Sequence, residues 1–213
     1  MFFKTLRRHG LTPDMDVLDV GCGQGRMARP LVEFLGAGTY SGFDIVKSGI
    51  DWCKTHYLDV PNFKFDHVPV YNKRYNKSGV VKASEFTFPY KDNQFDMVFL
   101  TSVFTHMFAK DVENYLLEIA RILRPGGKCL ITWFLLNEQS RAAREPFYNF
   151  AYDFDNVSKT TTPKSPEAAM AFDEEFVRGL YEKTGLVMQD IELGSWANPN
   201  SEFQLQDMII AKK

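Results

Sequence analysis

The chain has 213 residues, about one and a half times a typical domain, so we expect one domain with an elaboration rather than a string of modules. Its 45% hydrophobic and 24% charged residues are ordinary for a globular protein and exclude disorder of the whole chain. Lys and Arg (25) nearly balance Asp and Glu (27), and the net charge of −2 provides no global attraction for nucleic acid or anionic lipid. The unusual value is the aromatic content of 15%, which exceeds what a core of this size needs.

The three cysteines, Cys22, Cys53 and Cys129, have no CxxC spacing and lie in apolar or glycine-rich contexts. This pattern argues against a disulfide framework and a zinc site, and it is typical of a reducing compartment. The N-terminal residues lack the long apolar stretch of a signal peptide. The longest apolar run, 129–136, is far shorter than the roughly 20 residues that span a bilayer. We therefore expect a cytoplasmic protein without a membrane segment.

Strand-like and helix-like patterns alternate along the first 136 residues. Short apolar runs predict strands at 16–20, 39–43, 63–70, 95–100 and 128–136. Apolar residues at helical spacing predict helices at 27–35, 48–57 and 112–124, and the last of these must end before Pro125-Gly126-Gly127. The alternation indicates a doubly wound α/β fold with a parallel sheet.

The last third of the chain has a different pattern. Residues 172–184 are predicted to form a helix capped by Gly185, and two strands follow at 186–193 and 203–211. Consecutive strands without a helix between them are antiparallel, so we expect a mixed edge on the sheet. Residues 137–172 show no sustained periodicity.

The N-terminal segment, residues 2–8, has two phenylalanines followed by two arginines. It predicts a short amphipathic helix that either covers a ligand site or joins two subunits. A monomer and a homodimer are therefore both open.

A glycine-rich loop, Gly21-Cys22-Gly23-Gln24-Gly25, lies between the first predicted strand and the first predicted helix. In this position the backbone approaches a ligand closely, and the helix N-terminus offers unpaired N–H groups. The dinucleotide fingerprint GxGxxG needs glycine where this chain has Arg26. Asp19, just before the loop, would repel a pyrophosphate but attract a positively charged ligand such as S-adenosylmethionine. Asp44 is placed to accept hydrogen bonds from ribose hydroxyls, which serves NAD and S-adenosylmethionine equally.

Three segments resemble the motifs of class I S-adenosylmethionine-dependent methyltransferases. The segment 17–26 is similar to the family's first motif, 88–99 to the segment entering its fourth strand, and 123–127 to the turn before its fifth. The resemblance implies an α/β fold with a doubly wound, mostly parallel seven-stranded sheet in the order 3-2-1-4-5-7-6, an antiparallel last strand and helices on both faces. It also implies a single methyltransferase domain over 1–213, with substrate-side additions at about 71–94 and 137–172.

The resemblance also implies roles in binding S-adenosylmethionine. Asp19 would stabilise the methionine amino group, Asp44 would hold the ribose hydroxyls, and Ile45 would pack on the adenine. The acidic residue expected after the third strand is missing, so either Val70 or Ser84-Glu85 is the match that reads adenine. The other expected cofactor contacts are Gly21, Cys22, Gly23 and Gly25 in the loop, and Thr101 and Ser102 after the fourth strand.

Methyl transfer is an in-line displacement in which positioning supplies much of the rate, so a protein base is optional. His106, shortly after the fourth predicted strand, is the candidate base for a hydroxyl acceptor because its pKa suits proton transfer near neutrality. A purely structural histidine is the alternative. His9, His56 and His67 have no partners at ligand spacing, so no metal is expected.

The expected acceptor is a small molecule that is methylated on oxygen. The segment 71–77 mixes tyrosines with cations, which would suit RNA, but it fits a solvated loop as well, and nucleic acid is not the expected partner. Two other functions stay open. One is an S-adenosylmethionine-binding protein without transferase activity, and the other is a nucleotide-dependent oxidoreductase.

The aromatic surplus lies partly in the two additions, which hold 11 of the 31 aromatic residues. Five of these lie in the segment 147–154, where alternation would place four on one face of an extended stretch, and a helix is the alternative. We expect this segment either to form a wall of the acceptor pocket or to pack as a lid on the sheet edge.

Overall fold

The computed structural model describes residues 2–144, 146–198 and 200–213, and its largest feature is a seven-stranded sheet. The strands are β1 (Val17–Val20), β2 (Tyr40–Asp44), β3 (Phe63–His67), β4 (Phe95–Leu100), β5 (Leu123–Trp133), β10 (Val187–Glu192) and β11 (Asp207–Lys212). Their order is β10-β11-β5-β4-β1-β2-β3, with β1 to β5 parallel and β11 antiparallel to both of its neighbours. This arrangement confirms the predicted fold class, including the antiparallel last strand.

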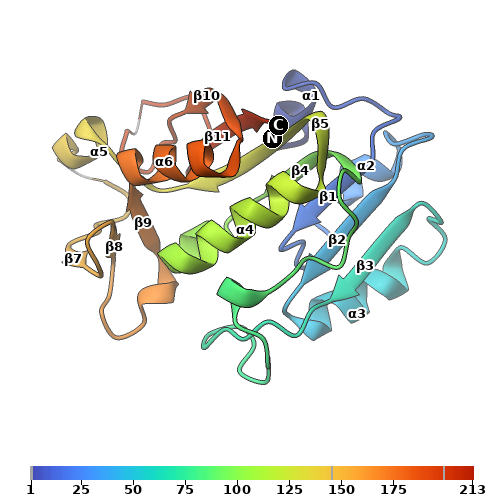
Figure 1. Cartoon of the computed structure of the whole chain (residues 1–213), viewed down its shortest axis with the longest axis horizontal. Coiled ribbons are helices and arrows are strands. Elements are labelled where there is room, and N and C mark those ends of the chain that lie inside the picture. The colour runs from blue at the N-terminus through green and yellow to red at the C-terminus, as the bar shows by residue number, and fades with distance from the viewer. Residues whose placement is uncertain (1, 145, 199) are drawn as a thin grey trace.

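Helices cover both faces of the sheet. They are α1 (Phe2–Arg8), α2 (Arg29–Val32), α3 (Lys47–His56), α4 (Ala109–Ile122) and α6 (Glu174–Thr184). In Figure 1, α4 and α6 cross in front of the sheet. Along β1, Leu18 and Val20 point into the core beneath α4 and α6, and Val17 points into the core of the opposite face, as the period of a strand requires.

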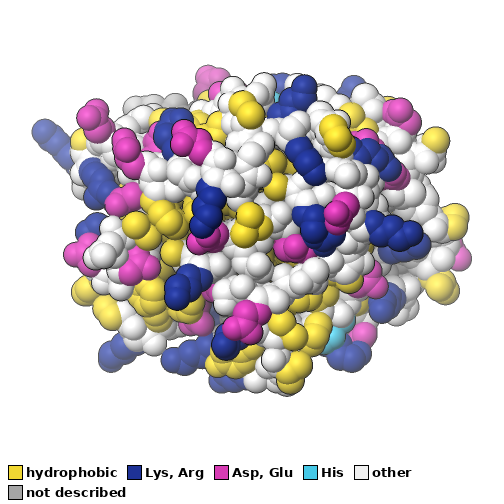
Figure 2. All heavy atoms as spheres, viewed as in Figure 1, with side chains coloured by type: hydrophobic (Ala, Val, Ile, Leu, Met, Phe, Trp, Pro, Cys, Tyr) yellow, Lys and Arg dark blue, Asp and Glu magenta, His cyan; other side chains and the backbone are white. Residues whose placement is uncertain are grey.

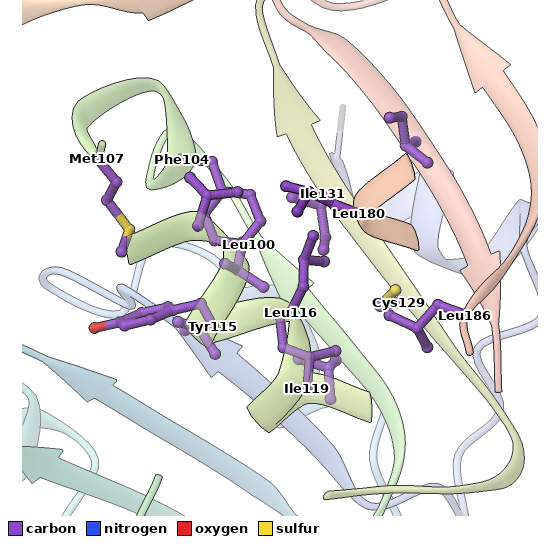
Figure 3. Close-up of a cluster of buried hydrophobic side chains, with 14 of the residues drawn as sticks. Leu100, Phe104, Met107, Tyr115, Leu116, Ile119, Cys129, Ile131, Leu180 and Leu186 are labelled. Carbon is purple, nitrogen blue, oxygen red and sulfur yellow. The ribbon is translucent and has the colours of Figure 1, made fainter. Parts of the chain in front are cut away.

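The clearest predicted helix packs as its apolar stripe indicates. Tyr115, Leu116 and Ile119 of α4 face the sheet, and Figure 3 shows them beside Leu100 of β4. The helix ends at Ile122, close to the predicted limit. The following strand begins at Leu123 rather than at 128, because Leu123 already pairs with Phe95 of β4. The Pro-Gly-Gly segment then forms an irregularity within the strand, and regular pairing resumes at Lys128.

The N-terminal helix α1 completes the core on the second face of the sheet. Phe2 and Leu6 are buried there, and the rings of Phe2 and Phe99 have centroids 5.6 Å apart. The ring of Phe3 packs edge-on against Phe34 at 5.2 Å. The predicted helix is therefore present, and among the described residues it packs on apolar core rather than at the lining of a ligand cavity.

A second, four-stranded sheet occupies the part of the chain where no periodicity was detectable. Its order is β6-β9-β8-β7, and Figure 1 shows it at the left end of the molecule. The strands are β6 (Leu135–Leu136), β7 (Tyr152–Asp153), β8 (Ser158–Thr160) and β9 (Met170–Asp173), and α5 (Glu138–Ala142) lies beside them in the sequence. Strands of two to four residues are too short to display a period of two.

The predicted boundaries were wrong at two helices for local reasons. The helix expected at 172–184 begins at Glu174, because Met170–Asp173 pairs as a strand. The helix expected at 27–35 is reduced to Arg29–Val32, with Pro30 in its first turn. The predicted cap Gly185 is confirmed by its left-handed backbone, with φ of 75°.

The surface carries no single-sign field on the face seen in Figure 2, where cationic and anionic side chains are intermixed. Within the described ranges, no helix is long and apolar enough to cross a membrane.

Candidate cofactor and acceptor site

A cavity of about 590 Å³ opens at the carboxyl ends of β1, β2 and β4. This is the edge of a doubly wound sheet where ligands bind, beside the point at which the strand order reverses. We call its two parts the glycine-loop end (Gly21, Gly23, Gln24, Asp44, Ile45) and the His106 end (Tyr75, His106, Phe108, Asp111, Glu167).

Three glycines give the loop its course. Gly21, Gly23 and Gly25 have φ of 77°, 55° and 69°, a backbone conformation that L-residues with side chains rarely adopt. A Cβ atom on Gly21 would lie 2.4 Å from Cγ2 of Val103, so the loop packs directly against the segment after β4. A Cβ on Gly23 would meet nothing within 4 Å, which leaves backbone free to face a ligand.

Asp44, at the end of β2, holds the loop in place. Its Oδ2 accepts a hydrogen bond from the amide of Gly23 at 2.8 Å, and its Oδ1 accepts one from the amide of Val46 at 2.7 Å. The carboxylate also lines the cavity. It therefore joins the glycine loop to the start of α3 while facing the space where a ligand would lie.

Asp19 lies beneath the loop and is almost completely buried. Its Oδ2 accepts a hydrogen bond from the Tyr40 hydroxyl at 2.8 Å, and its Oδ1 has no partner. Burial raises the pKa of Asp19 to about 7. An unpartnered buried carboxylate next to a ligand loop fits a cationic ligand group better than a pyrophosphate.

These residues fit S-adenosylmethionine. The open backbone at Gly23 can approach a ligand, Asp44 can accept hydrogen bonds from hydroxyl groups, and Asp19 supplies negative potential from below.

At the other end, His106 lies in a short 3-10 helix, η2 (Phe104–His106). Its Nδ1 donates a hydrogen bond to the carbonyl oxygen of Glu167 at 2.9 Å, so its Nε2 carries the lone pair. Burial lowers the pKa of His106, which keeps the ring neutral. The Tyr75 ring packs edge-on against the imidazole with centroids 5.6 Å apart. His106 is therefore held in one orientation as a neutral hydrogen-bond acceptor.

A family model described as a methyltransferase domain matches residues 18–131, more than half of the chain. The chain belongs to this methyltransferase family. A solved S-adenosylmethionine-dependent methyltransferase from Mesorhizobium loti shares its fold, with a TM-score of 0.67 at 14% identity over 99% of this chain and 97% of that one. These findings confirm the predicted methyltransferase family and its class I fold.

Two curated relatives of this methyltransferase differ in the atom that they methylate. A fatty-acid O-methyltransferase of Mycolicibacterium smegmatis is 32% identical over 118 residues, which are 54% of this chain and 36% of that protein. A sterol 24-C-methyltransferase of Yarrowia lipolytica is 33% identical over 140 residues, which are 64% of this chain and 32% of that protein. The chain thus spans about a third of the length of these relatives.

Most of the residues predicted for the methyltransferase site line this one cavity. They are Gly21, Gly23, Asp44, Ile45, Val70, Ser84, Ser102 and His106. Both candidates for adenine recognition, Val70 and Ser84, therefore face the same space. Ser102 has a strained backbone with φ of 59°, and its amide donates to Oγ1 of Thr132 at 2.8 Å.

Five predicted residues lie outside the cavity lining. Asp19 and Cys22 are buried beneath the glycine loop, and a Cβ on Gly25 would point at Tyr57, 2.9 Å from its ring. Thr101 precedes the lining residue Ser102 in the chain. Glu85 is exposed and pairs with Lys82 at 2.9 Å, because the 3-10 helix η1 (Ala83–Glu85) turns its side chain outward.

Several cavity residues were not predicted individually, although three of them lie in the two substrate-side additions. Asn72, Tyr75 and Asp111 lie in stretches that read as loop or helix start, and Glu167 lies in the aperiodic region. Asn72 and Tyr75 were indicated only as members of the expected addition at 71–94. Glu167 reaches the cavity because η3 (Pro166–Ala168) packs against η2, a contact between residues about sixty positions apart.

The aromatic segment 147–154 does not line the cavity. Tyr148 and Phe150 pack with Phe134 and Trp196 over the second sheet, and Tyr152 is half exposed. The prediction of four aromatics on one face is wrong, because the ring of Phe154 stacks on Phe108 instead of joining Tyr148 and Phe150. The packing is that of the lid alternative, and it borders a smaller cavity of about 320 Å³.

Proposed function

We propose that this protein transfers a methyl group from S-adenosylmethionine to an oxygen atom of a small-molecule acceptor. The observation that carries the proposal is the single cavity that unites the glycine loop, Asp44 and the oriented imidazole of His106. Two of these are elements of cofactor binding, and the third is a group that accepts a proton.

At the glycine-loop end, the chain binds and orients. The backbone of Gly21 and Gly23 and the carboxylate of Asp44 would hold the methionine and ribose parts, and Ile45, Val70 and Ser84, which line the same cavity, would enclose the adenine. When bound, S-adenosylmethionine supplies a methyl group that its positive sulfonium activates toward in-line displacement. Catalysis then rests mainly on the closeness and alignment of the acceptor.

At the His106 end, the imidazole supports an oxygen acceptor. A hydroxyl group loses its proton when it is methylated, and His106, which lines the cavity, would take that proton on Nε2. The hydrogen bond from Nδ1 to Glu167 fixes this tautomer. The fatty-acid O-methyltransferase relative supports oxygen, whereas the sterol relatives methylate carbon.

Titration calorimetry separates cofactor use from the oxidoreductase alternative. We expect S-adenosylhomocysteine to bind and NADH to give no heat, because Asp19 disfavours a pyrophosphate beside the loop. Binding of NADH alone would overturn the proposal. Transfer of radiolabelled methyl groups to the components of a metabolite extract then distinguishes an enzyme from a binding protein without transferase activity.

Two substitutions at His106 test its role as a base. His106→Ala is expected to lower kcat about 100-fold. His106→Asn keeps a donor for the Glu167 carbonyl but has no basic lone pair, so it should lower kcat to a similar extent while preserving the affinity for S-adenosylhomocysteine. A wild-type kcat in His106→Asn, together with a low one in His106→Ala, would assign the histidine to loop structure.

We also propose that the protein acts in the cytoplasm with its three cysteines as thiols, as the buried free cysteines of the structure support. Gel filtration distinguishes the monomer from the homodimer.

A further inference from the structure

Glu167 is a largely buried residue whose carboxylate has no partner among the described residues. It is only 7% exposed, and it lines the cavity at the His106 end. Its backbone carbonyl accepts the hydrogen bond from His106, but its carboxylate forms no hydrogen bond or ion pair with any residue in the described ranges. A carboxylate that lines a cavity without a partner can accept charge-assisted hydrogen bonds from a cationic group of a ligand.

A second carboxylate, that of Asp111, lies near Glu167 and adds to the negative charge at this end. Asp111 lines the same end, and its carboxylate accepts a hydrogen bond from the amide of Phe108 at 3.2 Å. Burial raises the pKa of Asp111, and the negative charge of Glu167 raises it further. Two cations lie nearby and are engaged with other groups: Lys82 lines the cavity but pairs with Glu85, and the guanidinium of Arg74 lies over the ring of Tyr75.

Aromatic rings line the same end and define the kind of cation that fits. Tyr75 packs against His106, and Phe108 is stacked on Phe154 with ring centroids 4.8 Å apart. Rings beside a carboxylate suit an organic ammonium group, whose positive charge is attracted to both.

We propose that the acceptor carries an amine as well as a hydroxyl group, and that the carboxylate of Glu167 binds its ammonium form. The inference rests on the proposed function, since it names a class of acceptor for the same cavity. The ammonium group serves recognition, while the hydroxyl group is the methylated one and gives its proton to His106.

Three phenols of matched shape test the inference on the protein saturated with S-adenosylhomocysteine. Tyramine carries an ammonium group, 4-propylphenol has a methyl group in its place, and 3-(4-hydroxyphenyl)propionate has a carboxylate there. We expect titration calorimetry to show tyramine binding at least about tenfold more tightly than 4-propylphenol, and the propionate binding most weakly. Equal affinities, or no binding of tyramine at millimolar concentration, would overturn the inference.

Glu167→Gln removes the charge and keeps the shape of the side chain. It should abolish the preference for tyramine over 4-propylphenol and leave the affinity for S-adenosylhomocysteine unchanged. Glu182→Gln, at an exposed position on α6, is the matched control and should keep the preference. A preference that survives in Glu167→Gln would assign the ammonium group to another partner and overturn the inference.

Assays of methyl transfer to the same phenols distinguish a failure of this inference from a failure of the proposed function. Tyramine that binds through Glu167 but gains no methyl group under any condition would leave the ammonium subsite intact and count against oxygen transfer to this class. Methylation of 4-propylphenol as fast as tyramine would support the transfer and reject the subsite.

Discussion

The two ends of the cavity differ in whether backbone or side chains line them. The glycine-loop end consists largely of backbone, held by three residues with positive φ and by an aspartate whose two oxygens each accept an amide hydrogen bond. The His106 end consists of side chains from segments far apart in the sequence, and one of them, Glu167, has a carboxylate without a partner in the part of the chain that the structure describes. Backbone groups suit the binding of a cofactor that is the same in every reaction. Side chains with an unpaired charge suit the selection of one acceptor among several.

The largest effect is expected at Gly21. In Gly21→Ala the new Cβ would collide with Val103, and the φ of 77° would strain the residue further, which together cost about 2 to 4 kcal/mol. We expect loss of S-adenosylhomocysteine binding by about 100-fold or more, measured by calorimetry, with a lowered Tm.

A matched glycine shows whether that effect belongs to the loop. Gly179 lies within α6, and a Cβ there would meet nothing within 4 Å. Gly179→Ala should stabilise the protein by about 0.5 to 1 kcal/mol and leave binding unchanged. Normal binding in Gly21→Ala would mean that the glycine loop tolerates a side chain and that the contrast between the two ends is overstated.

Asp44→Asn is the next most severe change. The amide has one carbonyl oxygen, so either Gly23 or Val46 loses its acceptor, and the ligand loses a charged one. We expect the Kd for S-adenosylhomocysteine to rise about 10- to 100-fold, as is typical for hydrogen bonds to charged groups. Asp51→Asn, on the exposed side of α3, should leave Kd unchanged. A larger loss in Asp51→Asn would indicate that α3 as a whole, rather than Asp44, sets the affinity.

The difference between the two ends also explains how far the sequence could predict them. The loop needs particular residue types at adjacent positions, so Gly21, Gly23 and Asp44 were identifiable without a structure. Strand β4 was predicted to the residue, because Phe95–Leu100 is apolar on both faces. Both signals are local in the sequence.

The His106 end left little local signal. Glu167 reaches His106 only through the contact of two short 3-10 helices, and strands of two to four residues carry the segment there. Glu85 was a reasonable match by type, yet one turn of η1 directs it to solvent and Ser84 to the cavity. Orientation within a single turn and contacts across sixty residues are properties of the packed chain.

Asp19 provides a pH-dependent test of the charge beneath the glycine loop. Its pKa of about 7 in the folded protein exceeds the ordinary value near 4, so the folded state keeps a proton that the unfolded state releases. The stability of the wild type should therefore fall as the pH rises from about 4 to about 7 and level off above. Asp19→Asn cannot ionise, and its advantage in Tm should grow across that window.

Binding should show the opposite trend. As Asp19 becomes charged, the affinity of the wild type for S-adenosylhomocysteine should rise with pH, and the affinity of Asp19→Asn should stay level. Thermal melts and titrations over this pH range measure both. A constant difference in Tm between the two proteins would show that Asp19 is already ionised at low pH and that Tyr40 alone compensates it.

The smallest effect is expected at Glu167 in the protein without ligand. If its carboxylate is uncompensated, Glu167→Gln removes an unfavourable charge beside Asp111 and should stabilise the protein by about 1 kcal/mol, or roughly 2 to 4 °C in Tm. Tyramine should narrow this difference by stabilising only the wild type, because a ligand that binds the folded state raises its stability. A destabilised Glu167→Gln would mean that the carboxylate already has a stabilising role in the folded chain. The polar groups of the His106 end would then be satisfied without a ligand, as those of the glycine loop are satisfied by the hydrogen bonds to Asp44.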